Sequence, residues 1–266
     1  MVKGARARIC RMGSASDEIA NNFADVLRRI DRAASRAGRH AEEITLVAVT
    51  KTHPASKILS LYQAGARHFG ENRVQERESK LDDTAKLDAM WHMIGHLQKN
   101  KVSRVPRMFD SVDSVDSIAL AEKLDRAMSE FIVGTANGKN NHRESLRKGN
   151  EERFRVLIEV KLDPEPAKSG ASDEDVPRLV EAILLMPYLN LQGLMGVPPY
   201  FDNPEDARPY FRHLRKLRDN IRKEMGPQLL PVLSMGMSHD FEISIEEGAS
   251  EVRVGTSLFG QREYAE

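Results

Sequence analysis

The chain has 266 residues, 40% hydrophobic and 30% charged, and its length allows one large α/β domain or two small ones. Lysine plus arginine equals aspartate plus glutamate, at 40 each, so no overall positive charge is available to hold nucleic acid or an anionic membrane surface. The single cysteine, Cys10, excludes an intrachain disulfide and a cysteine-based zinc site, which fits a cytoplasmic protein.

The N-terminal segment 1–15 is rich in arginine, lacks acidic residues and contains no apolar core. We expect it to be a flexible tail, and an organelle transit peptide is the alternative. The following segment, 16–37, carries apolar residues at helical spacing and is predicted to form a helix.

Short apolar runs then alternate with helical patterns along the rest of the chain. The eight runs that we predict as strands are 46–49, 68–70, 91–95, 108–112, 155–160, 191–196, 231–235 and 251–255. Eight strands alternating with helices in about 250 residues is typical of a (β/α)8 TIM barrel. An open doubly wound sheet is the alternative, but it usually carries a G-x-G-x-x-G turn, and none follows any strand here. We therefore predict a single barrel domain over 1–266.

The segment 134–153 departs from this rhythm. It is polar, rich in glycine and asparagine, and has no apolar period. We predict a mobile surface loop that lengthens one connection of the barrel.

The ends of the predicted strands carry the candidate chemistry, because active sites of such barrels form from the loops there. The loops after strands seven and eight usually hold phosphate in these barrels. Here they read SMGMS (234–238) and VGTS (254–257), whose small residues let backbone N–H groups approach an anion.

Lys51 follows the first predicted strand, where an ammonium is costly unless it has a partner or enters a reaction. A partly desolvated lysine has a lowered pKa, and its neutral amine can form a Schiff base. Together with a phosphate cradle, this suggests pyridoxal 5′-phosphate (PLP). A salt bridge between Lys51 and Glu71 at the barrel mouth is an equally open interpretation.

His92 and His96 stand four residues apart, as in helical metal-binding pairs. Their segment is predicted to be a strand, which does not bring both side chains to one metal ion. We therefore expect no metal site here.

Several motifs resemble the pyridoxal phosphate homeostasis protein family. They are AVTKTHP, FGENRVQE, WHMIGHLQKNKV, SVDS, KSG, GLMGVPP and LSMGMSHDFEISIEEGASEVRVGTSLFGQR, in this order over residues 16–263. The resemblance implies a PLP-binding barrel similar to the N-terminal domain of bacterial alanine racemase.

The resemblance also implies roles for individual residues. Lys51 would hold PLP as a Schiff base, Asn72 would lie near the ring, and Arg253 would face the pyridine nitrogen. A guanidinium only donates hydrogen bonds, so it would keep that nitrogen unprotonated and the ring a weak electron sink. The residues implied to hold the phosphate are Ser234, Met235, Met237, Ser238, Gly255 and Thr256. Lys168 is a possible second PLP contact.

The function implied is binding of PLP in intracellular vitamin B6 homeostasis, without turnover. A PLP-dependent amino-acid racemase is the alternative, but racemisation requires a second acid/base on the opposite face of the cofactor. In alanine racemases a tyrosine from a second domain supplies it, and here only Tyr200 stands near a predicted strand end. We therefore expect a monomer that exchanges PLP with PLP-dependent apo-enzymes and binds neither nucleic acid nor membrane.

Overall fold

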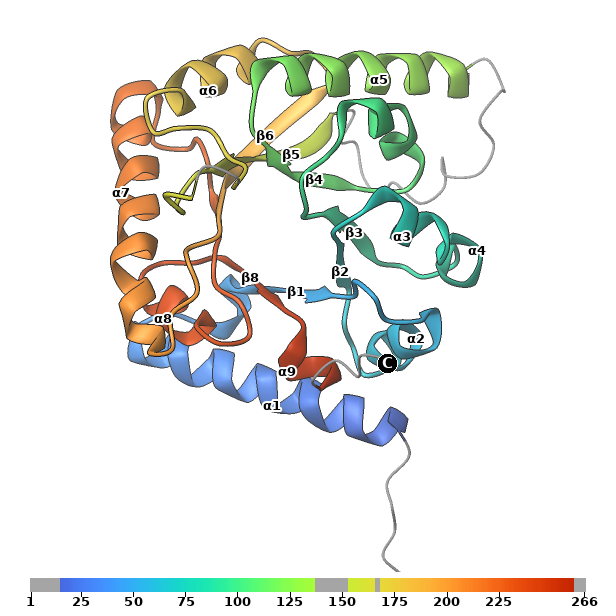
Figure 1. The fold of residues 1–266 in the computed structure, drawn as a ribbon, viewed down its shortest axis with the longest axis vertical. Helices are drawn as coiled ribbons and strands as arrows, with labels where there is room; N and C mark the ends of the chain where they lie inside the picture. The colour runs from blue at the N-terminus through green and yellow to red at the C-terminus, as the bar shows by residue number, and fades with distance from the viewer. Residues whose placement is uncertain (1–14, 137–152, 166–167, 261–266) are drawn as a thin grey trace, which may run out of the picture.

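Eight parallel strands close into a barrel in the computed structural model, which describes residues 15–136, 153–165 and 168–260 (Figure 1). The strands are β1 (Thr45–Val49), β2 (His68–Glu71), β3 (Met90–Met93), β4 (Ser111–Val115), β5 (Phe154–Val160), β6 (Leu189–Gly196), β7 (Val232–Ser234) and β8 (Glu251–Val254). Each strand pairs with the next along the chain, and β8 pairs with β1. The predicted (β/α)8 barrel is confirmed.

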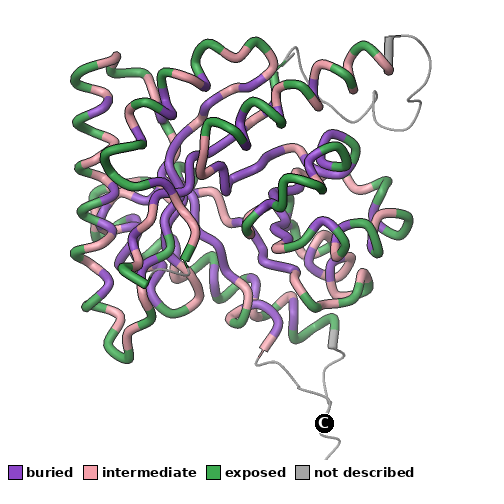
Figure 2. The backbone as a smooth tube through the Cα atoms, turned by 45° about the horizontal axis from the view of Figure 1, so that its top comes forward, coloured by how far each residue is buried: buried purple, intermediate pink, exposed green. Residues whose placement is uncertain are grey.

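Helices surround the barrel, so the strands are covered on their outer face (Figures 1 and 2). The α-helices are α1 (Ala15–Arg36), α2 (Ala55–Gln63), α3 (Val74–Glu78), α4 (Leu81–Thr84), α5 (Ile118–Ala136), α6 (Val176–Leu184), α7 (Arg208–Met225), α8 (Phe241–Glu246) and α9 (Thr256–Phe259). The 3-10 helices are η1 (Ala41–Glu43), η2 (Lys99–Arg107) and η3 (Pro204–Ala207). Helix α1 packs against α2, α8 and α9 through an apolar stripe that includes Phe23, Val26 and Ile30. None of the helices in the described segments has the length and apolar content that crossing a bilayer requires.

The barrel interior is filled by side chains from alternate positions of each strand. In β8 the inward positions are those of Glu251 and Arg253, and in β5 they include Arg155 and Glu159, because Arg155 reaches across the barrel to Glu251. All four have ionisable side chains. The barrel therefore contains a group of polar side chains inside an apolar wall, and Figure 2 shows this central region as buried backbone.

The prediction for the fourth strand is wrong by three residues. We expected it over 108–112, and it runs over Ser111–Val115. Met108 and Phe109 are buried in the hydrophobic core just before the strand, at the end of η2. The strand itself places Ser111 and Asp113 inward, where they bond to each other, so an apolar-run criterion passes over it.

Two predicted segments fall partly or wholly outside the described residues. Residues 134–136 of the predicted loop 134–153 continue α5, and 137–152 lie outside the described part. The predicted tail 1–15 lies outside it up to residue 14. The single-domain assignment of 1–266 stays a prediction for the same reason.

Candidate functional site

Lys51 lies two residues after the end of β1, in a turn with several fixed points. The N–H of Thr50 donates to the carbonyl of Gly70 at 2.9 Å, and the N–H of His53 donates to the carbonyl of Thr50 at 3.1 Å. Thr52 has φ of +65°, a left-handed conformation that non-glycine residues rarely adopt. The turn therefore holds Lys51, which is half-buried, in a defined position at the mouth of the barrel.

Glu71, the partner for Lys51 in the salt-bridge interpretation, is paired with another lysine. The ammonium of Lys80 lies 2.7 Å from Glu71 Oε1. Burial raises the pKa of Glu71, and the contact with Lys80 opposes that shift. Glu71 thus pairs with the buried ammonium of Lys80 and does not need Lys51 as its salt-bridge partner.

The loops after β7 and β8 are joined by Ser238. Its hydroxyl oxygen accepts the N–H of Gly255 at 3.1 Å and that of Ser257 at 3.3 Å, and its carbonyl accepts the Ser257 hydroxyl at 3.3 Å. Gly236 has φ of +91°, and a Cβ there would meet the hydroxyl of Ser244. Met237 donates its N–H to Asp240 Oδ1 at 2.6 Å. The two predicted phosphate loops therefore form one hydrogen-bonded unit, and Thr256 lies exposed at its rim.

Arg253 is buried inside the barrel and binds two groups below these loops. Its Nη1 donates to the hydroxyl of Ser234 at 2.7 Å, and its Nη2 donates to the carbonyl of Gly196 at 3.0 Å. Burial lowers its pKa, and the carboxylates of Glu251 and Asp113 oppose that shift. Ser234, predicted to bind phosphate, is thus a partner of the arginine.

Three further predicted residues occupy different environments. Asn72 follows β2 and is half-buried, with Gly95 packed against its backbone. Met235 is fully buried in the core and donates its N–H to the carbonyl of Glu251 at 3.0 Å. Lys168 is exposed, and its ammonium lies 3.9 Å from Glu165. The contacts of these three residues with PLP stay predictions.

Glu159 is a buried carboxylate that the sequence reasoning missed. Its Oε1 accepts the hydroxyl of Ser169 at 3.1 Å, and its Oε2 is buried without a hydrogen-bond partner. Burial raises its pKa, and Arg253 opposes that shift. An acid inside the apolar run RVLIEV (155–160) was the signal that could have identified it.

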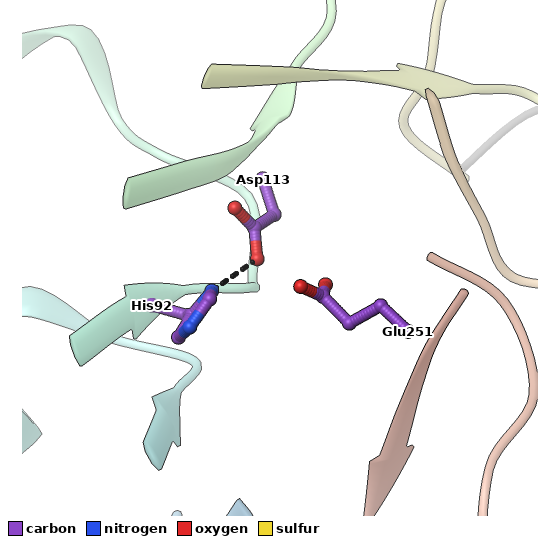
Figure 3. Close-up of side chains that lie close together, drawn as sticks. All are labelled: His92, Asp113 and Glu251. Atoms are coloured by element: carbon purple, nitrogen blue, oxygen red, sulfur yellow. Dashed lines mark hydrogen bonds and ion pairs between the residues drawn. The ribbon is translucent and has the colours of Figure 1, made fainter. Parts of the chain in front are cut away.

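A second polar cluster lies deeper in the barrel, where His92, Asp113 and Glu251 approach one another (Figure 3). Their possible metal-binding atoms lie within 4.8 Å of each other. However, Arg155 Nη2 lies 2.7 Å from Glu251 Oε2, and His92 Nδ1 lies 2.9 Å from Asp113 Oδ2. Burial opposes protonation of His92, yet Asp113 raises its pKa. Each of the two carboxylates thus has a basic partner, and we interpret the cluster as barrel core. His96 lies apart, exposed and 3.4 Å from Asp116.

We expect His68 to lower the free energy of unfolding at acid pH, and the substitution His68→Gln to reduce that loss. Its Nδ1 lies 3.1 Å from His92 Nε2. Burial, with His92 and Arg155 nearby and only Asp113 opposing them, lowers the pKa of His68 to about 3. A lowered folded-state pKa gives stability that is present above the unfolded value of about 6.5 and is lost as pH falls from there towards 3. One such group costs at most about 2 kcal/mol between pH 7 and 5.

Urea unfolding at pH 7 and pH 5 measures this effect, and His40→Gln, at an exposed histidine, is the control. The contribution of His92 has the opposite sign, because its raised pKa stabilises the fold at low pH and fades as pH rises. An equal loss of stability in wild type and His68→Gln would contradict the prediction.

A closed parallel barrel with a lysine after its first strand, a buried arginine in its last and linked loops beyond strands seven and eight defines a barrel of the alanine racemase N-terminal type. Residues 25–263 match the family model for the alanine racemase N-terminal domain. An alanine racemase from Corynebacterium glutamicum shares this fold, with a TM-score of 0.65 at 18% identity over 93% of this chain and 62% of that one.

Proteins with higher sequence identity show which family within this barrel type the chain belongs to. The pyridoxal phosphate homeostasis protein of Aquifex aeolicus (strain VF5) is 43% identical over 240 residues, which cover 90% of this chain and 96% of the relative. The structure of PipY from Synechococcus elongatus PCC7942 with PLP bound is 34% identical and covers 91% of this chain and 100% of that one, with a TM-score of 0.74. This chain belongs to the pyridoxal phosphate homeostasis protein family.

Proposed function

We propose that this chain binds pyridoxal 5′-phosphate at the barrel mouth, with Lys51 as the point of covalent attachment, and acts in intracellular vitamin B6 homeostasis. The observation that carries this proposal is the fixed turn that presents Lys51 at the same barrel end as the linked loops after β7 and β8. The relatives named for PLP homeostasis, and PipY with PLP bound, support it.

The residues present fit this cofactor. When bound, PLP supplies an aldehyde that condenses with a lysine amine with release of water, and a phosphate that backbone N–H groups can hold. The N–H groups of Gly255 and Ser257 converge on one oxygen, the Ser238 hydroxyl, and a phosphate would replace that hydroxyl as their acceptor. Arg253, buried below, can donate to a ring nitrogen but cannot accept from it. Asn72 is proposed to line the ring.

We also propose that the protein holds and releases the cofactor without turning over amino acids. Racemisation needs an acid/base held at a defined place on the far side of the cofactor. Tyr200 is the tyrosine near the end of β6, and it is 76% exposed and stacked on His239. We propose that PLP-dependent apo-enzymes receive the released PLP. We also propose that the protein is cytoplasmic and monomeric.

Borohydride reduction after incubation with PLP, followed by peptide mass spectrometry, tests the site. A pyridoxyl group on the peptide that contains Lys51 is the expected result. Modification of Lys168 alone would keep the cofactor but overturn the site, and absence of any adduct would overturn the proposal. Deuterium exchange at the α-carbon of alanine in D2O, above that of free PLP, would contradict the absence of turnover.

A further inference from the structure

A buried ion pair lies directly behind the turn that carries Lys51. Lys80 Nζ lies 2.7 Å from Glu71 Oε1 and donates to the carbonyl of Thr50 at 2.9 Å. The hydroxyl of Thr50 donates to the same Glu71 oxygen at 2.6 Å. Thr50, Glu71 and Lys80 are all buried. Each of the three residues thus contacts the other two. Thr50, the residue that directly precedes Lys51, is held through both its carbonyl and its hydroxyl.

The geometry separates this triangle from the barrel mouth. In β1 and β2, Val49 pairs with Gly70, and a Cβ on Gly70 would meet inward-facing Val47, so Glu71 points outward. Thr50 shares the side of Glu71, because its hydroxyl bonds to that carboxylate. Lys51 follows in the turn at the carboxyl end of β1, which is the mouth of the barrel. Lys80 therefore acts on the backbone of the turn from outside the barrel.

Burial of the Lys80 ammonium is unfavourable unless its charge makes contacts that compensate for the lost hydration. Burying an ammonium and a carboxylate costs several kcal/mol each, and an apolar pair of similar volume is often as stable. Here the ammonium also fixes a backbone carbonyl, a contact that an apolar side chain cannot make. That carbonyl additionally accepts the N–H of His53, so the ammonium holds the turn at its first residue.

We propose that Lys80 is a positioning residue for Lys51. Held by Glu71, its ammonium fixes the carbonyl of Thr50 and so sets the direction in which the amine of Lys51 enters the barrel mouth. This inference rests on the proposed attachment of PLP to Lys51. Misplacement of a reacting group by about 1 Å can cost about a hundredfold in rate. Lys80 can therefore affect the reaction of the Lys51 amine by fixing the turn, without touching the amine itself.

The test compares PLP capture by wild type and by the double variant Lys80→Met/Glu71→Gln. The double change removes both charges together, so neither is left buried and unpaired, and the glutamine keeps an oxygen for the Thr50 hydroxyl. We expect the double variant to fold and still be modified at Lys51, but to capture PLP at least about tenfold more slowly. Stopped-flow absorbance at several pH values, well below the melting temperature, measures the rate.

A matched control changes another ion pair, Arg29→Met/Glu242→Gln, which joins α1 to α8 at 2.7 Å. We expect it to lose stability without a change in capture rate. A capture rate of the Lys80→Met/Glu71→Gln variant equal to that of wild type would overturn the positioning role. Failure of wild type itself to form an adduct at Lys51 would instead overturn the proposed function, so the two failures are distinguishable. Should the double variant not fold, Glu71→Gln alone, which weakens the hold on Lys80, is expected to slow capture, and an unchanged rate overturns the proposal.

Discussion

Lys51→Arg is expected to abolish the borohydride-trapped pyridoxyl group and leave the barrel folded. Arginine keeps the positive charge and most of the side-chain length, so the turn between β1 and α2 retains its electrostatic environment. A guanidinium stays protonated in proteins and offers no neutral amine to condense with an aldehyde. Absorbance of the bound cofactor and peptide mass spectrometry after reduction measure the loss, which we expect to reach background.

Lys168→Arg is the matched control for this experiment. Lys168 also follows a strand, but it is exposed and lies beside Glu165. We expect it to retain full labelling at Lys51. Retained labelling of the Lys51→Arg protein at Lys168 would show that the cofactor sits on a different lysine.

The periodicity of the sequence located most of the barrel, for a physical reason. Strand β1 is apolar on the face that packs against helices, and its inward residues are apolar too, so together they form a continuous run. Strand β4 fails this criterion because its inward residues, Ser111 and Asp113, belong to the polar cluster with His92. Polar side chains inside the barrel are paired between strands that lie far apart in the sequence. A short segment of sequence therefore does not reveal them.

The candidate site shows the same limit. The strand-end positions of Lys51 and of the SMGMS and VGTS loops could be read from local signals, whereas their contact with PLP was implied by the family resemblance and stays a prediction. Lys80 was not, since it lies in a charged segment that reads as a solvated helix face, and only folding brings it to Thr50. Ser234 was predicted from its loop to bind phosphate, but its strand position turns it towards Arg253.

The charged interior has a consequence for stability, which rests on the pair between Arg155 and Glu251. Arg155→Met is expected to destabilise the protein by about 3–5 kcal/mol, because it leaves a carboxylate buried without its cation. Glu251 is 1% exposed and close to Asp113, so water does not compensate for the lost charge. Glu251→Met is expected to cost less, since the Arg155 side chain is 18% exposed and can be hydrated.

The double variant Arg155→Met/Glu251→Met distinguishes a true charge pair from two independent packing residues. Removing both charges leaves neither buried without its partner, so we expect the double variant to be more stable than Arg155→Met alone. Urea unfolding followed by circular dichroism and by fluorescence of Trp91, the only tryptophan and a buried residue of β3, measures all three variants. Additive losses would mean that the two side chains stabilise the barrel only by filling it. A strongly non-additive result would show that Arg155 and Glu251 stabilise the barrel interior as a pair of opposite charges.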